Sequence, residues 1–154
     1  MEYGQAPLLD RLIDEDPANS GESVQQRLLN ARQIKALVAR DLENLLNSRR
    51  DVTSIPEGFR ELQHSVATYG LKDFTALSTD SRKVRVTIQK DVEQAIAQFE
   101  PRLRQVKVVL DTGDQRERKL SFKISAMLVV DPIREPVAFD TFFDATRKEY
   151  VVSD

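Results

Sequence analysis

The chain has 154 residues, of which 40% are hydrophobic and 31% are charged, and its formal net charge is -2. These values describe one soluble domain with a single hydrophobic core, and the balanced charge gives no reason to expect a nucleic-acid partner. Cysteine is absent, which excludes disulfides, thiol nucleophiles and thiolate metal sites. No apolar run approaches the roughly 20 residues that span a bilayer, and the start lacks the features of a secretory signal. We therefore expect a cytoplasmic protein without direct membrane insertion.

Residues 1–22 are predicted to form a docking segment and a linker. Leu8, Leu9, Leu12 and Ile13 have the spacing of one or two turns of amphipathic helix. So short a helix is not stable alone in water, so we expect it to dock on its own domain or on a partner. The expected contacts include Leu9, Arg11 and Leu12. The polar residues that follow predict the linker.

Two long helices are predicted next. Ser23 and Gln26 form a capping-box pattern, and an apolar stripe at helical spacing then continues to about residue 48. A second apolar stripe predicts a helix over 80–99, which ends because Pro101 disfavours helical geometry in the residue before it. A short helix is expected between them, over 59–67.

After residue 101 the apolar period changes to two, which is typical of strands. Strands are predicted over 106–110 and 120–130, joined as a hairpin, with a third at 137–143 and a fourth at 150–152. The expected fold class is α+β, with N-terminal helices packed on one face of a small antiparallel sheet of about four strands. Residues 23–154 would form one domain, and an open edge of the sheet could accept a strand from another chain.

The sequence offers little for catalysis. His64 is the only histidine, so the chain cannot supply a zinc site from histidine and cysteine, and no glycine-rich phosphate loop occurs. We expect no cofactor. Glu93 and Glu100 are the candidates for a glycosidase-like carboxylate pair, although acidic residues more commonly just face water.

The tripeptide Glu100-Pro101-Arg102 is the most unusual local feature. Proline stiffens the backbone where a helix gives way to a strand, so a carboxylate and a guanidinium are predicted to lie at a rigid, exposed corner. A rigid surface loses little entropy when it binds, and arginine suits carboxylates and carbonyls of a partner. The alternative is a helix stop flanked by two solvated charges.

Four segments occur in the order and spacing of one known family. They are Leu8-Leu9-Asp10-Arg11-Leu12, Leu45-Leu46-Asn47-Ser48-Arg49-Arg50, Tyr69-Gly70-Leu71-Lys72-Asp73 and Phe99-Glu100-Pro101-Arg102-Leu103. Together they resemble the TssE family, the baseplate component of bacterial type VI secretion systems and the counterpart of the small wedge protein of contractile phage tails. The resemblance extends over nearly the whole chain.

This resemblance implies a structural role in a cytoplasmic baseplate associated with the inner membrane. The implied partners are the wedge subunits TssF and TssG and the sheath proteins TssB and TssC, whose assembly the chain would help to start, with TssK as an additional candidate. Glu100, Pro101 and Arg102 would grip the helical core of the wedge. The strands that carry Val137, Phe139, Thr141, Tyr150 and Val152 would pair with sheath strands.

The family is also labelled lysozyme-like, which leaves a muramidase-like peptidoglycan glycosidase as the alternative. Only 6% of the residues are aromatic, which is few for a sugar-binding cleft.

Overall fold

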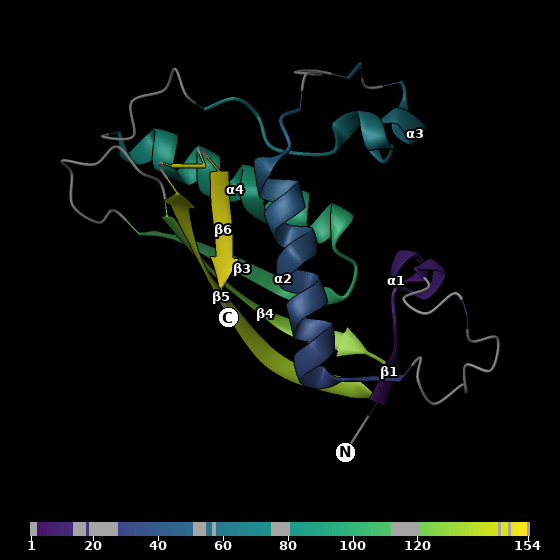
Figure 1. Ribbon diagram of the computed structural model, residues 1–154. Coiled ribbons are helices and arrows are strands. Elements are labelled where there is room, and N and C mark those ends of the chain that lie inside the picture. The colour runs from purple at the N-terminus through teal and green to yellow at the C-terminus, as the bar shows by residue number, and fades with distance from the viewer. Residues whose placement is uncertain are drawn as a thin grey trace.

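Two long helices cover one face of a four-stranded antiparallel sheet in the computed structural model (Figure 1). The structure describes residues 3–13, 18, 28–50, 55–56, 58–74, 81–111, 121–144, 146–147 and 149–153. The helices are α2 (Ala31–Asn47) and α4 (Arg82–Phe99), and the sheet contains β3 (Leu103–Asp111), β4 (Ser121–Val130), β5 (Ile133–Asp144) and β6 (Glu149–Ser153) in that order. The predicted α+β class and the four-stranded antiparallel sheet are confirmed.

Helix α2 begins later than the sequence pattern suggested. Its capping box is formed by Asn30, whose side chain accepts from the Gln33 backbone N–H at 2.9 Å, while the Gln33 side chain accepts from the Asn30 N–H at 3.0 Å. The residues just before it form a strand, β2 (Leu28–Asn30), so a continuous helix from residue 23 is wrong. The predicted capping pair, Ser23 and Gln26, lies outside the described residues.

An N-terminal arm, which we define as residues 3–13, lies beside the first half of α2. It contains β1 (Tyr3–Gln5), which pairs antiparallel with β2, and α1 (Leu8–Leu12), a short helix where one was predicted. Figure 1 shows α1 next to the point where α4 gives way to the sheet. The arm is therefore docked on its own domain.

The core forms between the two helices and the sheet. Helix α4 starts two residues after its predicted beginning and ends at Phe99, as the following proline predicted. Over the predicted helix at 59–67 the chain is less helical than expected, and it forms α3 (Arg60–Gln63) and the 3₁₀ turn η2 (Val66–Thr68). The most deeply buried large side chains come from both layers and are Phe139, Ile34, Leu42, Leu45, Ile88, Ile96, Ile124 and Leu128.

The other face of the sheet is open to solvent. Side chains alternate along β4 and β5 between buried and exposed, as strand geometry requires. Val109 and Phe142 lie on the exposed face, where 62% and 50% of their surface remains accessible. Strand β3 carries a bulge between Arg104 and Lys107, and Gln105 within it has a φ of 54°.

Candidate protein-binding site

The end of α4 brings Glu100 and Arg102 together inside the fold. The Arg102 Nε donates to Glu100 Oε1 at 2.6 Å, and Arg102 Nη2 donates to Glu100 Oε2 and to Asp41 of α2. Glu100 is only 3% exposed. The expectation of an exposed Glu100 and Arg102 is therefore wrong: the turn at Pro101 folds both side chains back over α2, where Asp41 provides a second carboxylate. Pro101 itself is exposed, as predicted.

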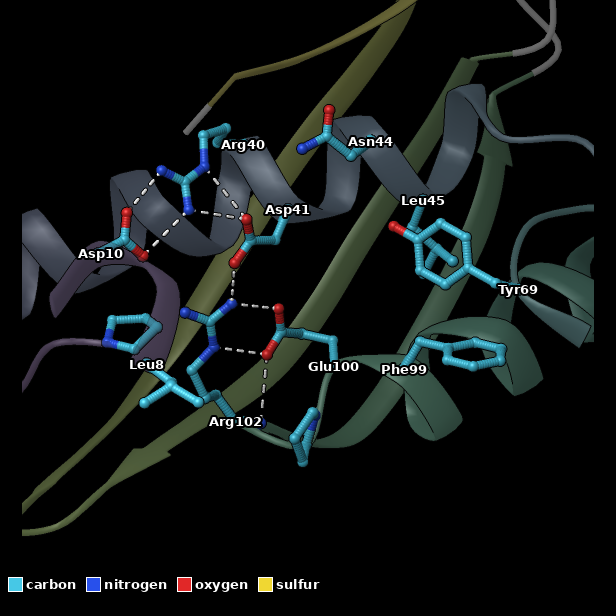
Figure 2. Close-up of a pocket in the computed structure, with 12 residues that line it drawn as sticks. Leu8, Asp10, Arg40, Asp41, Asn44, Leu45, Tyr69, Phe99, Glu100 and Arg102 are labelled. Atoms are coloured by element: carbon cyan, nitrogen blue, oxygen red, sulfur yellow. Dashed lines mark hydrogen bonds and ion pairs between the residues drawn. The ribbon is translucent and has the colours of Figure 1, made fainter. Parts of the chain in front are cut away.

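This ion-pair network continues to the N-terminal arm. Arg40 donates to Asp41 Oδ1 from Nε and Nη2 at 3.1 and 3.0 Å, and it donates to both Asp10 oxygens at 2.7 and 3.1 Å. Figure 2 shows the resulting chain of alternating charges, Asp10–Arg40–Asp41–Arg102–Glu100. Three segments that are distant in the sequence are joined by it.

Two pKa shifts follow from these contacts. The hydrogen bonds from Arg40 hold the pKa of the Asp10 carboxyl below its usual value, against a smaller opposing effect of burial. Burial acts to lower the pKa of Arg102, but its hydrogen bonds and charge interactions with Glu100 and Asp41 outweigh that effect, so the pKa is raised. Both groups are therefore charged at neutral pH, and the network is ionic.

A surface cavity of about 480 Å³ opens beside this network. Its apolar walls are formed by Leu8, Leu45, Tyr69, Phe99 and Pro101, and the rings of Tyr69 and Phe99 meet edge to face with centroids 5.1 Å apart. Arg102 also lines the cavity, and its Nη1 is buried without a hydrogen-bond partner within the described part of the chain. Apolar walls over a rigid ionic base suit the side chains of a protein partner.

Both candidate catalytic carboxylates are hydrogen-bonded within the fold. Glu93 Oε1 accepts from the backbone N–H of Val108 at 2.9 Å and from the Gln89 amide at 3.4 Å. Both oxygens of Glu100 are engaged by Arg102. His64 is exposed at the end of α3, and in the described ranges no cluster of three or more potential ligands could hold a metal ion.

The outer edge of β6 is covered by α2. The Asn47 side chain donates to the Tyr150 carbonyl at 2.8 Å and accepts from the Tyr150 N–H at 2.7 Å, while Glu43 accepts from the Val152 N–H at 3.1 Å. The expectation of a free edge at Tyr150 and Val152 is therefore wrong, because side chains of α2 occupy those backbone groups. Burial raises the pKa of the Tyr150 hydroxyl to about 12.

Strand β5 is central along part of its length and unpaired on one side along the rest. It pairs with β4 over Ile133–Thr141 but with β6 only over Asp140–Asp144. Val137, Phe139 and Thr141 point into the core and are 6%, 0% and 3% exposed, so their side chains are not available to a partner. These residues were expected on an edge strand; only the part of β5 before Asp140 has an unpaired side in the described structure.

The backbone groups on that side can be identified from the pairing. Because the Tyr150 backbone faces away from β5, the alternate residues Val151 and Ser153 face it, opposite Phe142 and Asp140. In β5 the even-numbered residues therefore face the β6 side, so the backbones of Arg134, Pro136 and Ala138 face outward beyond the end of β6. We call this the open flank of β5. Pro136 lacks a backbone N–H. Because the backbone at this position faces outward, the proline costs no hydrogen bond between β5 and its neighbouring strands.

The predicted contact residues of the N-terminal arm are Leu9, Arg11 and Leu12. Arg11 and Leu12 are exposed, and Leu12 is 71% accessible. The side chain of Leu9 lies outside what the structure describes. Sequence reasoning missed Asp10, Arg40 and Asp41. The only hint was that Asp10 interrupts an apolar cluster, since nothing local distinguishes Arg40 and Asp41 from other charges on α2.

The family of the chain follows from a comparison with family models. Residues 32–133 match the model described as baseplate wedge protein gp25, which is more than half of the chain. The chain belongs to this family. The matched range includes α4, all of α2 after its first residue, the corner at residues 100–102 and the β3–β4 hairpin. The predicted resemblance to a baseplate wedge protein is confirmed.

Two solved structures share the fold of this chain. One, described as the baseplate complex from the type VI secretion system, matches with a TM-score of 0.51 and 15% identity over 74% of this chain and 97% of that chain. Another, a putative tail lysozyme from Geobacter sulfurreducens, matches with a TM-score of 0.50 and 15% identity over 77% of this chain and 96% of that chain. At this identity the likeness shows the fold alone. No curated protein matches the sequence, and no helix in the described ranges is long and apolar enough to cross a membrane.

Proposed function

We propose that this protein is a non-enzymatic subunit of a type VI secretion baseplate that binds TssF and TssG and helps to start the TssB and TssC sheath. It would act in the cytoplasm at the baseplate on the inner membrane, with TssK as an additional candidate partner. The observation that carries the proposal is the apolar cavity beside Pro101, set on a rigid ionic base in a chain of the baseplate wedge family.

In this proposal the residues of the corner have separate tasks. Glu100 is buried and fixes Arg102 through its two oxygens, so it supports the site from within. Pro101 is exposed at the cavity wall, where a partner meets it. A surface whose side chains are already fixed loses little conformational entropy on binding.

Changing Pro101 to Asp tests wedge binding while keeping every member of the ion-pair network in place. We expect the affinity for a purified TssF–TssG complex to fall by about tenfold or more, because the new carboxylate must be desolvated against apolar walls. The measurement is a titration of labelled protein with the complex, supported by a thermal melt that shows an intact fold. Pro136 to Asp is the matched control: it changes another exposed proline on the sheet, away from the cavity. Equal affinity of both variants and the original protein would remove the proposed wedge site.

The proposal places the sheath contact at the open flank of β5. The backbone N–H of Val108 at the β3 edge is taken by Glu93, and β6 is covered by Asn47 and Glu43. The carbonyl of Pro136 and the amide groups of Arg134 and Ala138 have no strand beside them in the described structure. An incoming sheath strand could pair there by adding main-chain hydrogen bonds.

Ala138 to Pro tests this contact, because it removes an outward N–H and leaves the bonds to β4 in place. We expect TssB–TssC polymerisation on purified wedges to fall by about tenfold, since a proline next to the incoming strand both removes a donor and obstructs pairing. Electron microscopy would count the sheaths. Ala138 to Val, which keeps the N–H, should polymerise normally, and TssF–TssG binding should be unchanged in both. Normal sheath formation by the proline variant would refute strand addition at this flank.

The muramidase alternative has its own direct test. The bonds at Glu93 and Glu100 give each carboxylate a role in holding the fold, which favours the non-enzymatic proposal. Release of muropeptides from peptidoglycan by the pure protein, lost on changing either residue to Gln, would reverse this conclusion.

A further inference from the structure

Side chains of the two long helices occupy backbone groups along the outer edges of the sheet. At the β3 edge, Glu93 accepts from the Val108 N–H, and along β6 the side chains of Asn47 and Glu43 bind backbone groups of the strand. Within the described residues, no side chain is bonded in this way to the outward backbone of the open flank of β5. Unpaired strand edges tend to pair with a second copy of themselves. The open flank is therefore a place where two copies of this chain could join.

Pairing of two copies at the flank would involve few residues. Ser153 of β6 stands opposite Asp140, so a second copy has access to the outward backbones of Arg134, Pro136 and Ala138. In antiparallel pairing, two residues whose backbones face each other exchange one hydrogen bond in each direction. If Pro136 faces its own copy, Arg134 faces Ala138 on either side of it. The flank then offers three facing pairs, each of which would carry two hydrogen bonds if every residue had an N–H.

Pro136 removes two of these hydrogen bonds. Because proline has no N–H, neither copy donates at the central pair, and both central carbonyls lose their donor. Shifting the two strands by two residues does not avoid this loss, because Pro136 of each copy then faces Arg134 or Ala138 of the other and again donates nothing. Every two-fold register that joins more than one facing pair therefore lacks two hydrogen bonds.

A strand of a different protein meets only one proline at this flank. It loses the single hydrogen bond that Pro136 would donate, and it can place a β-bulge opposite the ring. Charge provides no comparable selection. When Pro136 faces its own copy, the two Arg134 side chains lie four residues, roughly 14 Å, apart along the strands, which exceeds the Debye length at physiological salt. The proline therefore distinguishes a foreign strand from the chain's own.

We propose that Pro136 determines the specificity of the open flank: it prevents pairing with a second copy of this chain and leaves the flank free for a strand of another protein. The proline stands where the sheet itself loses nothing, since the backbone at this residue faces away from β4. The inference goes beyond the proposed function, because it holds for any incoming strand and does not depend on the sheath.

Pro136→Thr on the full chain tests this proposal. Threonine restores the N–H without adding a large apolar surface, and it suits strand geometry. We expect the variant to form dimers with a dissociation constant lower than that of the original chain by about tenfold or more, because two hydrogen bonds return. Sedimentation equilibrium over a range of concentrations measures this constant, and a thermal melt checks the fold. Pro136→Val should give the same result.

Two further variants show where the copies join. Pro136→Thr combined with Ala138→Pro removes another outward donor of the same flank, so we expect the chain to become monomeric again. Pro136→Asp, the control for wedge binding, also restores the N–H. It places two carboxylates opposite each other, however, and should stay monomeric.

The outcomes separate this inference from the proposed function. If Pro136→Thr and Pro136→Val keep the mass of the original chain at every concentration, the inference is wrong and the proposed sheath contact is unaffected. Dimers that persist after Ala138→Pro would also overturn it, since the copies would then join elsewhere. Normal sheaths from the chain that carries Ala138→Pro alone would refute the sheath contact and leave this inference standing.

Discussion

Replacing Glu100 by Ala is expected to lower the free energy of unfolding by about 3 kcal/mol or more, because it leaves the mostly buried Arg102 with Asp41 as its one remaining carboxylate partner among the described residues. Glu100 is 3% exposed and its two oxygens fix the guanidinium. Removing one member of a buried ion pair leaves the other charge buried and poorly paired. This lowers the free energy of unfolding far more than the loss of an exposed ion pair does.

The measurement is the midpoint of urea unfolding, with the slope checked for a constant two-state transition. Glu61 to Ala is the control, since Glu61 is exposed on α3 and should change stability by less than about 0.5 kcal/mol. Equal midpoints for the two variants would show that the Glu100–Arg102 pair does not support the fold. The prediction follows from the burial of Glu100, which was expected at an exposed corner, and it explains why Pro101 is the better probe of binding.

Periodic patterns predicted most of the fold. The stripe that contains Ile34, Val38 and Leu42 placed α2, and the period-two alternation placed β4 and β5 within a few residues. These patterns are reliable because each side chain must face either the core or the solvent. The start of α2 was wrong because two capping boxes follow each other in the sequence, and pairing of Leu28–Asn30 with β1 selects the second.

The candidate site was harder to predict, because it is built from contacts that are distant in the sequence. The tripeptide at residues 100–102 was recognised, but its burial depends on Asp41, some sixty residues earlier. Likewise, the spacing of Tyr150 and Val152 indicates a strand, yet only the position of α2 shows that Asn47 and Glu43 cover its edge. A sequence shows which polar groups are present, whereas the tertiary fold decides which of them are already hydrogen-bonded within the chain.

Replacing Gly70 by Ala is the second change with a large expected effect. Gly70 has a φ of +99°, and an added Cβ would lie 2.5 Å from the Ser48 carbonyl oxygen and 2.8 Å from its carbon. These are backbone atoms at the end of α2, so they cannot move aside as a side chain can. The conformational cost is about 1–2 kcal/mol and the steric cost is of similar size, so we expect a total loss of about 3 kcal/mol.

The close approach at Gly70 is required by the two backbone hydrogen bonds of the next residue, Leu71. Leu71 N–H donates to the Ser48 carbonyl at 2.9 Å and Arg50 N–H donates to the Leu71 carbonyl at 2.8 Å, which ties the loop to the end of α2. Tyr69, the residue before, forms a wall of the cavity. Displacing this loop would therefore weaken the fold and deform the proposed wedge site together.

Gly58 to Ala provides the control, since within the described part of the chain no atom outside its two neighbouring residues lies within 4 Å of the position of its added Cβ. Its stability should stay unchanged or rise by about 0.4–1 kcal/mol, because alanine restricts the unfolded chain. Thermal melts would measure the stability of each variant, and TssF–TssG titrations below the melting range would measure its affinity for the wedge. A Gly70 variant with the original melting temperature would show that the loop can move away from Ser48. One that is destabilised but binds normally would show that the cavity does not need Tyr69 held in this position.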